Sequence, residues 1–233
     1  MKMLKIRLSF LSSLLLLCLF STSPLCWSQE AGKIITLPPP SYKGEVSLEE
    51  AIFRRKSIRR YRDEALSLQE ISQLLWAAGG KTIDGVTGPT RAYPSAGGIY
   101  PIEIYVVIGK VEGIKAGVYR YNWWNHYIKM VKEGDKRFEL MRVSLNQRMI
   151  GDAPVSFVFI ANYFDTRRRY GKRGEIRYVP MDVGGAGENL SLQAVALGLG
   201  TVIIGAFNDE AVKMLLGVRD KTPLYIMPVG KPK

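Results

Sequence analysis

Residues 118–131 read VYRYNWWNHYIKMV, and this stretch decides the fold class. VYRY at 118–121 and YIKMV at 127–131 are rich in β-branched and aromatic residues, which favour strands, and a five-residue connection separates them. The stretch therefore predicts a hairpin, which is an antiparallel pair of strands. Helical and strand patterns alternate elsewhere, so the hairpin places the protein in the α+β class, as one domain of two or more layers.

Apolar runs and capping signals predict the other elements. Helices are expected after two S-x-x-E capping boxes, Ser47 with Glu50 and Ser67 with Glu70. Further helices are expected at 135–150, 181–200 and 208–216. Strands are expected at 102–109, 154–162, 201–207 and 223–230. Glycine and proline argue against regular structure at 81–98, and the basic segment 165–177 is expected to be a loop.

Composition and charge narrow the classes of function. The chain has 233 residues and a net charge of +12, from 33 Lys and Arg against 21 Asp and Glu, which indicates an anionic partner. A single histidine, His126, and two cysteines are too few for a Cys/His zinc site. A catalytic triad has only His126 to draw on, and its position beside two tryptophans favours a packing role in the hairpin.

The N-terminus has the pattern of a secretory signal peptide at 1–28. Lys2, Lys5 and Arg7 precede an apolar run at 8–20, and small residues follow before Gln29. An uncleaved anchor is the alternative, although the run is short for a membrane span. Cleavage would remove both cysteines and leave a Pro-rich tether at 29–46 and one domain at 47–233. The sequence thus predicts export, to the periplasm or beyond.

Segment 54–62, RRKSIRRYR, holds six basic residues and no acid. Guanidinium groups and a serine hydroxyl suit a phosphate monoester, which offers several charged acceptors. The composition supports a solvated basic surface equally well. Two small-residue segments, TRAYPSAGGIYP at 90–101 and GLGTVIIGAF at 198–207, allow a flat ligand to approach the main chain. Their alternatives are an ordinary glycine-rich connection and tight packing of a helix on a strand.

These segments, in this order and with the closing MPVGKP, resemble the nitroreductase superfamily, and most of all its SagB/ThcOx-type branch of azoline dehydrogenases. The resemblance spans about 185 residues, from Ser47 to Pro232. It implies a nitroreductase-like FMN fold with a mixed, mainly antiparallel sheet flanked by helices. It also implies an obligate homodimer with FMN at the subunit interface.

The resemblance also implies a set of cofactor-binding residues. The phosphate and ribityl grip would comprise Arg55, Lys56, Ser57 and Arg59, with Lys231 as a second phosphate contact. The loop along one edge of the isoalloxazine would comprise Pro94, Ser95, Ala96 and Gly97. Gly205 and Ala206 would lie near flavin N5, where a main-chain amide can donate. Covalent attachment of FMN at 84–90 is disfavoured, because Pro89 precedes Thr90 where the attachment motif has alanine.

Tyr178 is the candidate catalytic residue. Arg177-Tyr178 stands where azoline dehydrogenases carry a basic residue followed by tyrosine. A guanidinium stays protonated and cannot serve as a base, which leaves Tyr178, or a carboxylate such as Glu188, as the acid–base group.

The prediction is an exported FMN-dependent oxidoreductase that transfers hydride to or from a small or peptide substrate. No nucleic-acid partner is expected, and the electron donor is left open. One alternative is a non-catalytic flavin-fold module that binds an anionic polymer through 54–62 and 167–177. Another is a cytoplasmic nitroreductase whose N-terminus only mimics a signal.

Overall fold

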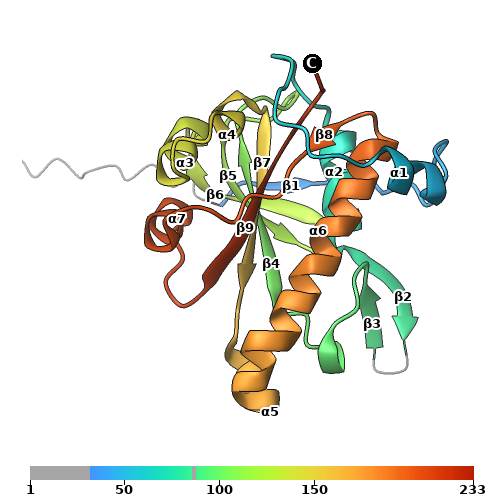
Figure 1. Cartoon of the computed structure of the whole chain (residues 1–233), viewed down its shortest axis with the longest axis vertical. Helices are drawn as coiled ribbons and strands as arrows, with labels where there is room; N and C mark the ends of the chain where they lie inside the picture. The colour runs from blue at the N-terminus through green and yellow to red at the C-terminus, as the bar shows by residue number, and fades with distance from the viewer. Residues whose placement is uncertain (1–31, 86–87) are drawn as a thin grey trace, which may run out of the picture.

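A seven-stranded sheet forms the centre of the protein in the computed structural model, which describes residues 32–85 and 88–233 (Figure 1). Its strand order is β1-β6-β5-β4-β7-β9-β8, and each neighbouring pair is antiparallel. The strands are β1 (Ile34–Thr36), β4 (Ile102–Ile108), β5 (Gly117–Asn122), β6 (Tyr127–Glu133), β7 (Val155–Ala161), β8 (Gly200–Thr201) and β9 (Thr222–Gly230). The expected hairpin is β5–β6, and the α+β class with a mainly antiparallel sheet is confirmed.

Helices cover both faces of this sheet. The helices are α1 (Leu48–Arg54), α2 (Leu68–Gly79), α3 (Arg137–Val143), α4 (Arg148–Asp152), α5 (Phe164–Arg173), α6 (Val179–Ala196) and α7 (Asp209–Leu216). The alternation of buried residues along β4 explains the layers. Ile104 and Val106 pack in the core beneath α2 and α6, whereas Tyr105 and Val107 pack beneath α3, α4 and α7. No helix in the described ranges is long and apolar enough to span a bilayer.

The two capping signals differ in the structure. At α2 the Ser67 hydroxyl accepts from the Glu70 N–H, and the Glu70 carboxylate accepts from the Ser67 N–H, so the full box is present. At α1 the Ser47 hydroxyl accepts from the Glu50 N–H, but the Glu50 carboxylate instead pairs with Arg54 at 3.0 Å. The first turn of α1 therefore has only one of the two hydrogen bonds of a capping box.

Four expectations for secondary structure are wrong. Segment 201–207 forms only the end of β8 and an isolated bridge between Ile204 and Ile226. The helix expected at 135–150 is split into α3 and α4 by Leu145 and Asn146, whose φ angles are 55° and 57°. Segment 165–177 is helical, and Gly171 kinks it. Segment 81–98 contains a hairpin of β2 (Lys81–Gly85) and β3 (Gly88–Arg91), in which Thr90 Oγ1 donates to the Ile83 carbonyl at 2.7 Å.

Part of the expected tether belongs to the sheet. Strand β1 pairs with β6, and Leu37 is buried in the core. The next carbonyl, that of Pro38, accepts from the Ser72 hydroxyl at 2.5 Å and lies 3.1 Å from His126 Nε2. Burial lowers the pKa of His126, whose Nδ1 lies 2.8 Å from the Tyr121 hydroxyl. His126 therefore anchors the chain before α1, while the expected signal segment lies outside the described residues.

Candidate functional site

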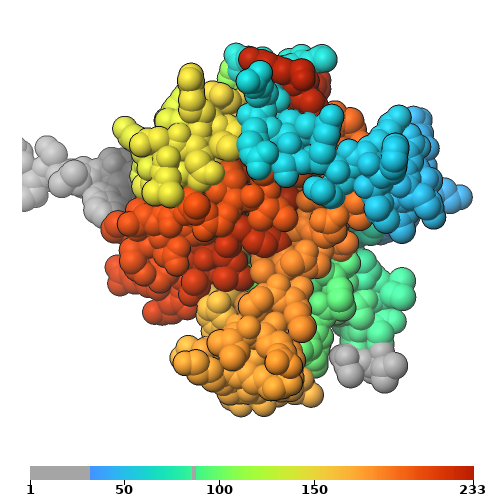
Figure 2. Space-filling view, viewed as in Figure 1, coloured from blue at the N-terminus to red at the C-terminus, as the bar shows by residue number. Residues whose placement is uncertain are grey.

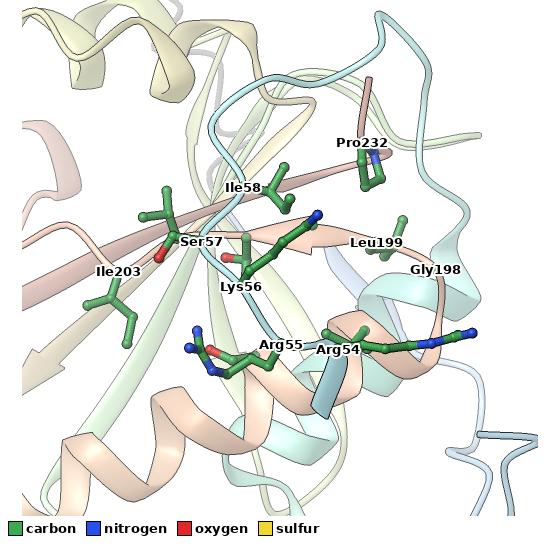
Figure 3. Close-up of a pocket in the computed structure, with 14 residues that line it drawn as sticks. Arg54, Arg55, Lys56, Ser57, Ile58, Gly198, Leu199, Ile203 and Pro232 are labelled. Carbon is green, nitrogen blue, oxygen red and sulfur yellow. The ribbon is translucent and has the colours of Figure 1, made fainter. Parts of the chain in front are cut away.

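A pocket of about 260 Å³ opens where the chain leaves α1 and crosses the C-terminal end of α6 (Figure 3). The basic cluster supplies one wall through Arg54, Arg55, Lys56, Ser57 and Ile58. The opposite wall comprises Ser191 and Val195 of α6, the segment 198–203, and Pro232. Three of the four residues predicted to grip phosphate and ribityl, Arg55, Lys56 and Ser57, are thus brought together.

Close contact between two main-chain segments positions this wall. The Arg55 N–H donates to the Ala51 carbonyl at 3.0 Å and ends α1. The chain then runs beside β8, where Ser57 forms a parallel bridge with Thr201 and the Ile58 N–H donates to the Thr201 carbonyl at 2.8 Å. A Cβ on Gly200 would lie 2.6 Å from the Ile58 side chain, so glycine is needed for this approach. The small residues of 198–207 therefore serve the fold as well as the pocket.

The pocket wall carries positive charge that the protein only partly neutralises. Arg54 points away from Arg55 (Figure 3) and pairs with Glu50 at 3.0 Å. Arg55 faces Glu188 at the longer distance of 3.8 Å, and Lys56 has no carboxylate within 4.0 Å in the part of the chain described. Exposed cations beside a serine hydroxyl fit a phosphate group, which accepts several charge-assisted hydrogen bonds.

Two other predicted grip residues lie outside this wall. Lys231 donates to Glu64 at 3.0 Å. This hydrogen bond raises the pKa of Lys231 and lowers the pKa of Glu64. Arg59 is exposed and does not line the pocket. Lys231 would have to leave Glu64 to reach a phosphate, although its neighbour Pro232 does line the pocket.

The loop predicted to border the isoalloxazine is a structured turn near the other end of α6. After Pro94, the Ser95 hydroxyl donates to Asp182 Oδ2 at 2.5 Å and accepts from the Tyr100 N–H at 2.9 Å. Ala96 begins a 3-10 turn, and burial raises the pKa of Asp182. The sequence did not identify Asp182 as a site residue. The only signal for it was its position near the start of an apolar helix.

Gly97 requires its small size and backbone freedom. Its φ is 63°, a left-handed conformation, and a Cβ would lie 2.6 Å from the Tyr170 hydroxyl. Arg169 Nη1 also donates to the Gly97 carbonyl at 3.2 Å. The α5 segment thus packs directly on this loop.

In a single chain the loop and the phosphate wall do not share a pocket. Asp182 holds the loop, whereas Ser191 lines the wall nine residues further along α6. At 1.5 Å per residue, these two points are about 13 Å apart along the helix. None of the four loop residues lines the wall's pocket.

Gly205 and Ala206 follow the pocket wall directly along the chain and are exposed. A Cβ on Gly205 would contact nothing within 4 Å. Ala206 is held by Gln147, whose Nε2 donates to its carbonyl at 2.8 Å. Within the described residues no hydrogen bond uses the Gly205 N–H, so this donor is open to a ligand.

Tyr178 ends a π-helical turn between α5 and α6, at Gly174–Tyr178. Its hydroxyl accepts from Arg173 Nε at 3.1 Å, and its ring meets Tyr170 edge to face at 5.0 Å. The cation found beside the phenol is Arg173, whereas the sequence neighbour Arg177 is exposed. Glu188, the other candidate acid–base group, faces Arg55. Across residues 32–85 and 88–233, no cluster of His, Cys, Asp or Glu could hold a metal ion.

Comparison with known proteins identifies the class. A model of the nitroreductase family matches residues 52–231. The chain is also 41% identical over 187 residues to a nitroreductase-type protein of Methanocaldococcus jannaschii, covering 80% of this chain and 92% of that protein. This chain belongs to the nitroreductase family of oxidoreductases, whose members typically bind flavin.

Solved structures and a further relative agree with this family. A nitroreductase-type protein of Ralstonia eutropha superposes with a TM-score of 0.75 at 29% identity, covering 88% of this chain and 91% of that one. The Escherichia coli microcin synthetase McbBCD complex shares the fold, with a TM-score of 0.65 at 21% identity and coverage of 97% and 85%. The trifolitoxin-processing protein TfxB of Rhizobium leguminosarum is 35% identical over 144 residues, 58% of this chain and 38% of its own length.

Proposed function

We propose that this chain is an exported FMN-dependent oxidoreductase that transfers hydride to or from a small or peptide substrate. The observation that carries the proposal is the pocket wall of Arg55, Lys56 and Ser57, which offers two cations and a hydroxyl to one phosphate. When bound, FMN supplies a two-electron carrier that the protein's own side chains lack.

The chain's own residues would position the cofactor. Arg55 and Lys56 neutralise the phosphate, and Ser57 hydrogen bonds to it. The open N–H of Gly205 is available to a flavin ring nitrogen, as the resemblance implies. The loop Pro94–Gly97 would border the flavin edge, with Ser95 fixed by Asp182.

Reconstitution tests the cofactor. We expect the purified chain to bind FMN in preference to FAD, because the wall is sized for one phosphate monoester and no dinucleotide G-x-G-x-x-G motif follows a strand. The measurement is quenching of flavin fluorescence at micromolar protein, with FAD as the matched ligand. A colourless protein that quenches neither flavin contradicts the proposal.

We further propose a homodimer in which the loop of one subunit completes the phosphate wall of the other. The separation of these two groups in one chain supports this, and so does the apolar face of α1. Leu48, Ile52 and Phe53 are 62%, 57% and 89% exposed on this short helix. Such a cluster of exposed apolar side chains is typical of an interface.

Phe53→Glu is expected to separate the subunits, because a carboxylate cannot be buried unpaired at an apolar interface. Light scattering should then give the mass of one chain, and FMN affinity should fall with it. Met214→Glu is the matched control, since Met214 is 72% exposed on α7, in the layer on the other face of the sheet. A wild-type chain that is monomeric with flavin bound contradicts the dimer.

Tyr178→Phe is expected to retain FMN and the fold but to slow substrate turnover at least tenfold. This bound lies below the usual acid–base contribution of about 10²–10⁴, because water replaces part of the role of the lost hydroxyl. The reason is loss of a hydroxyl that a neighbouring cation, Arg173, steadies as it gives up a proton. The measurement is single-turnover flavin reoxidation. Wild-type rates with each of several acceptors, quinones and nitroaromatics included, would show that Tyr178 only packs the wall.

Export rests on the signal pattern at 1–28, and N-terminal sequencing of the native protein tests it. A chain beginning near Gln29 supports export, and an intact N-terminus in the soluble fraction supports a cytoplasmic enzyme. Free nicotinamide is scarce outside the cytoplasm. The electron donor proposed for an exported enzyme is therefore another reduced molecule or a membrane partner.

The non-catalytic alternative has one favourable observation. Helix α5 projects from the body of the molecule (Figure 2), and Arg167, Arg168, Arg169, Lys172 and Arg173 are exposed on it. Such an arm could bind an anionic polymer. A colourless protein that binds heparin at physiological salt would favour this function over the flavin enzyme.

A further inference from the structure

A second pocket, of about 290 Å³, borders the chain between the Pro94–Gly97 loop and β4. Its lining includes Arg91 at the end of β3, Ile99–Pro101 of the loop, and Trp123 and Tyr127 of the β5–β6 hairpin. It shares no lining residue with the first pocket. An inference about its ligand therefore does not depend on the proposed FMN site.

Arg91 is the unusual feature of this pocket. Its side chain is 5% exposed, and in the described structure no carboxylate lies within 4.0 Å of it. Nε donates to the Gly79 carbonyl at 2.6 Å and Nη1 to the Ile102 carbonyl at 2.9 Å. No partner within the described ranges is assigned to Nη2. A buried cation without a carboxylate in contact is costly, and burial lowers the pKa of Arg91.

Aromatic rings surround this guanidinium. Its Cζ lies 5.0 Å from the ring of Tyr93, 5.8 Å from that of Tyr100 and 5.2 Å from that of Trp123. Cation–π contacts steady the positive charge but leave it unneutralised. The rings of Tyr100 and Trp123, which line the pocket, also give it flat apolar walls, which favour a planar ligand body.

The remaining charges leave the pocket with a positive balance. Glu103 is bridged by Arg120 at 3.1 Å and by Lys221 at 2.6 Å, and Asp165 pairs with Arg168 at 3.2 Å. Lys129, on β6, is exposed and makes no ion pair in the described part of the chain. The lining acids are therefore each paired with a base. Arg91 and Lys129 have no carboxylate within 4.0 Å in the described residues, and Glu103 and Asp182 act on Arg91 only at longer range.

We propose that this pocket binds a small organic carboxylate with a planar body, the carboxylate facing Arg91 and Lys129. A carboxylate can accept a charge-assisted hydrogen bond from Nη2, the guanidinium nitrogen without an assigned partner, and supplies a negative charge in direct contact with Arg91. The same chemistry occurs in a free aromatic acid and at the C-terminus of a peptide that ends in an aromatic residue.

Calorimetric titration of the full protein tests this, with benzoate as the free acid and N-acetyl-Gly-Phe as the peptide terminus. Each has a neutral match, benzamide and the C-terminal amide. We expect one or both acids to bind with a dissociation constant of about 1 mM or below, which is reasonable for ligands of this size. Binding of only one identifies the source. Equal binding of acid and amide, or no binding of either acid, overturns the proposal.

Variants locate the site. Arg91→Lys should weaken acid binding at least tenfold, because one ammonium cannot occupy the positions of Nε, Nη1 and Nη2 at once. Lys129→Ala should weaken it about threefold, and less at high salt, as an exposed charge does. Lys129 is exposed, so this variant remains informative if Arg91→Lys does not fold. Arg219→Ala is the control, a basic residue exposed between α7 and β9. Equal losses in all three variants would indicate diffuse charge and overturn the assignment.

Discussion

We expect Arg55→Ala to weaken FMN binding roughly tenfold to hundredfold, as measured by fluorescence titration. The substitution removes a charge-assisted hydrogen bond to the phosphate, which is worth about 1.5–3 kcal/mol. Arg55 lines the pocket, and its nearest carboxylate, Glu188, is 3.8 Å away, so its charge is free to serve a ligand. A retained fold, by circular dichroism, assigns the loss to the contact itself.

Arg62→Ala is the matched control from the same basic segment. Arg62 does not line the pocket, its side chain is 60% exposed, and it faces Glu64 at 3.8 Å. Its removal should leave the affinity for FMN within about twofold, as expected of a solvated charge. Equal losses for both variants would mean that the segment acts as a diffuse basic patch and that no defined phosphate grip exists.

Gly187→Ala should destabilise the protein by about 2–3 kcal/mol, the usual cost of overpacking a core. Gly187 is a buried residue of α6, and a Cβ there would collide with the hydroxyl of Tyr225. This tyrosine cannot move aside easily. Its hydroxyl donates to the Val183 carbonyl, and its ring packs 4.8 Å from that of Phe159.

Urea denaturation at a fixed protein concentration measures this effect. Gly184→Ala, on the same helix, is the control, because a Cβ there meets nothing within 4 Å. That change should stabilise the protein by up to about 1 kcal/mol through helix propensity. A shift of the same sign in both variants would mean that the contact with Tyr225 does not limit the packing of α6 on the sheet.

Sequence patterns predicted the elements whose partners are near in the chain. The hairpin at 118–131 needs only its own two strands, and β5–β6 is where it was expected. Segment 201–207 has equally β-branched residues, but it follows its neighbouring strand only briefly. Strand β9 pairs with β7 along one edge, and its other edge meets 200–204 at Gly200, Thr201 and Ile204. Propensity alone cannot reveal where the chain leaves that ladder.

The residues of the candidate site also fall into those that a local sequence motif predicts and those that only the fold brings together. Arg55, Lys56 and Ser57 form one continuous motif, and the structure places them on one wall as the motif suggests. The link between Ser95 and Asp182 joins residues 87 positions apart, so only the fold reveals it. The basic segment 165–177 was expected to be a loop, yet helical geometry continues on either side of the kink at Gly171.

Both edges of the sheet end in very short strands, β1 with three residues and β8 with two. A long open edge exposes a row of unpaired N–H and C=O groups to which strands of other chains can add. Strand β1 covers the start of β6, and the uncovered remainder of β6 carries Lys132 and Glu133. At the β6 edge the sheet thus offers little template for strand addition, which protects a protein from forming β-aggregates when it must fold among other unfolded chains.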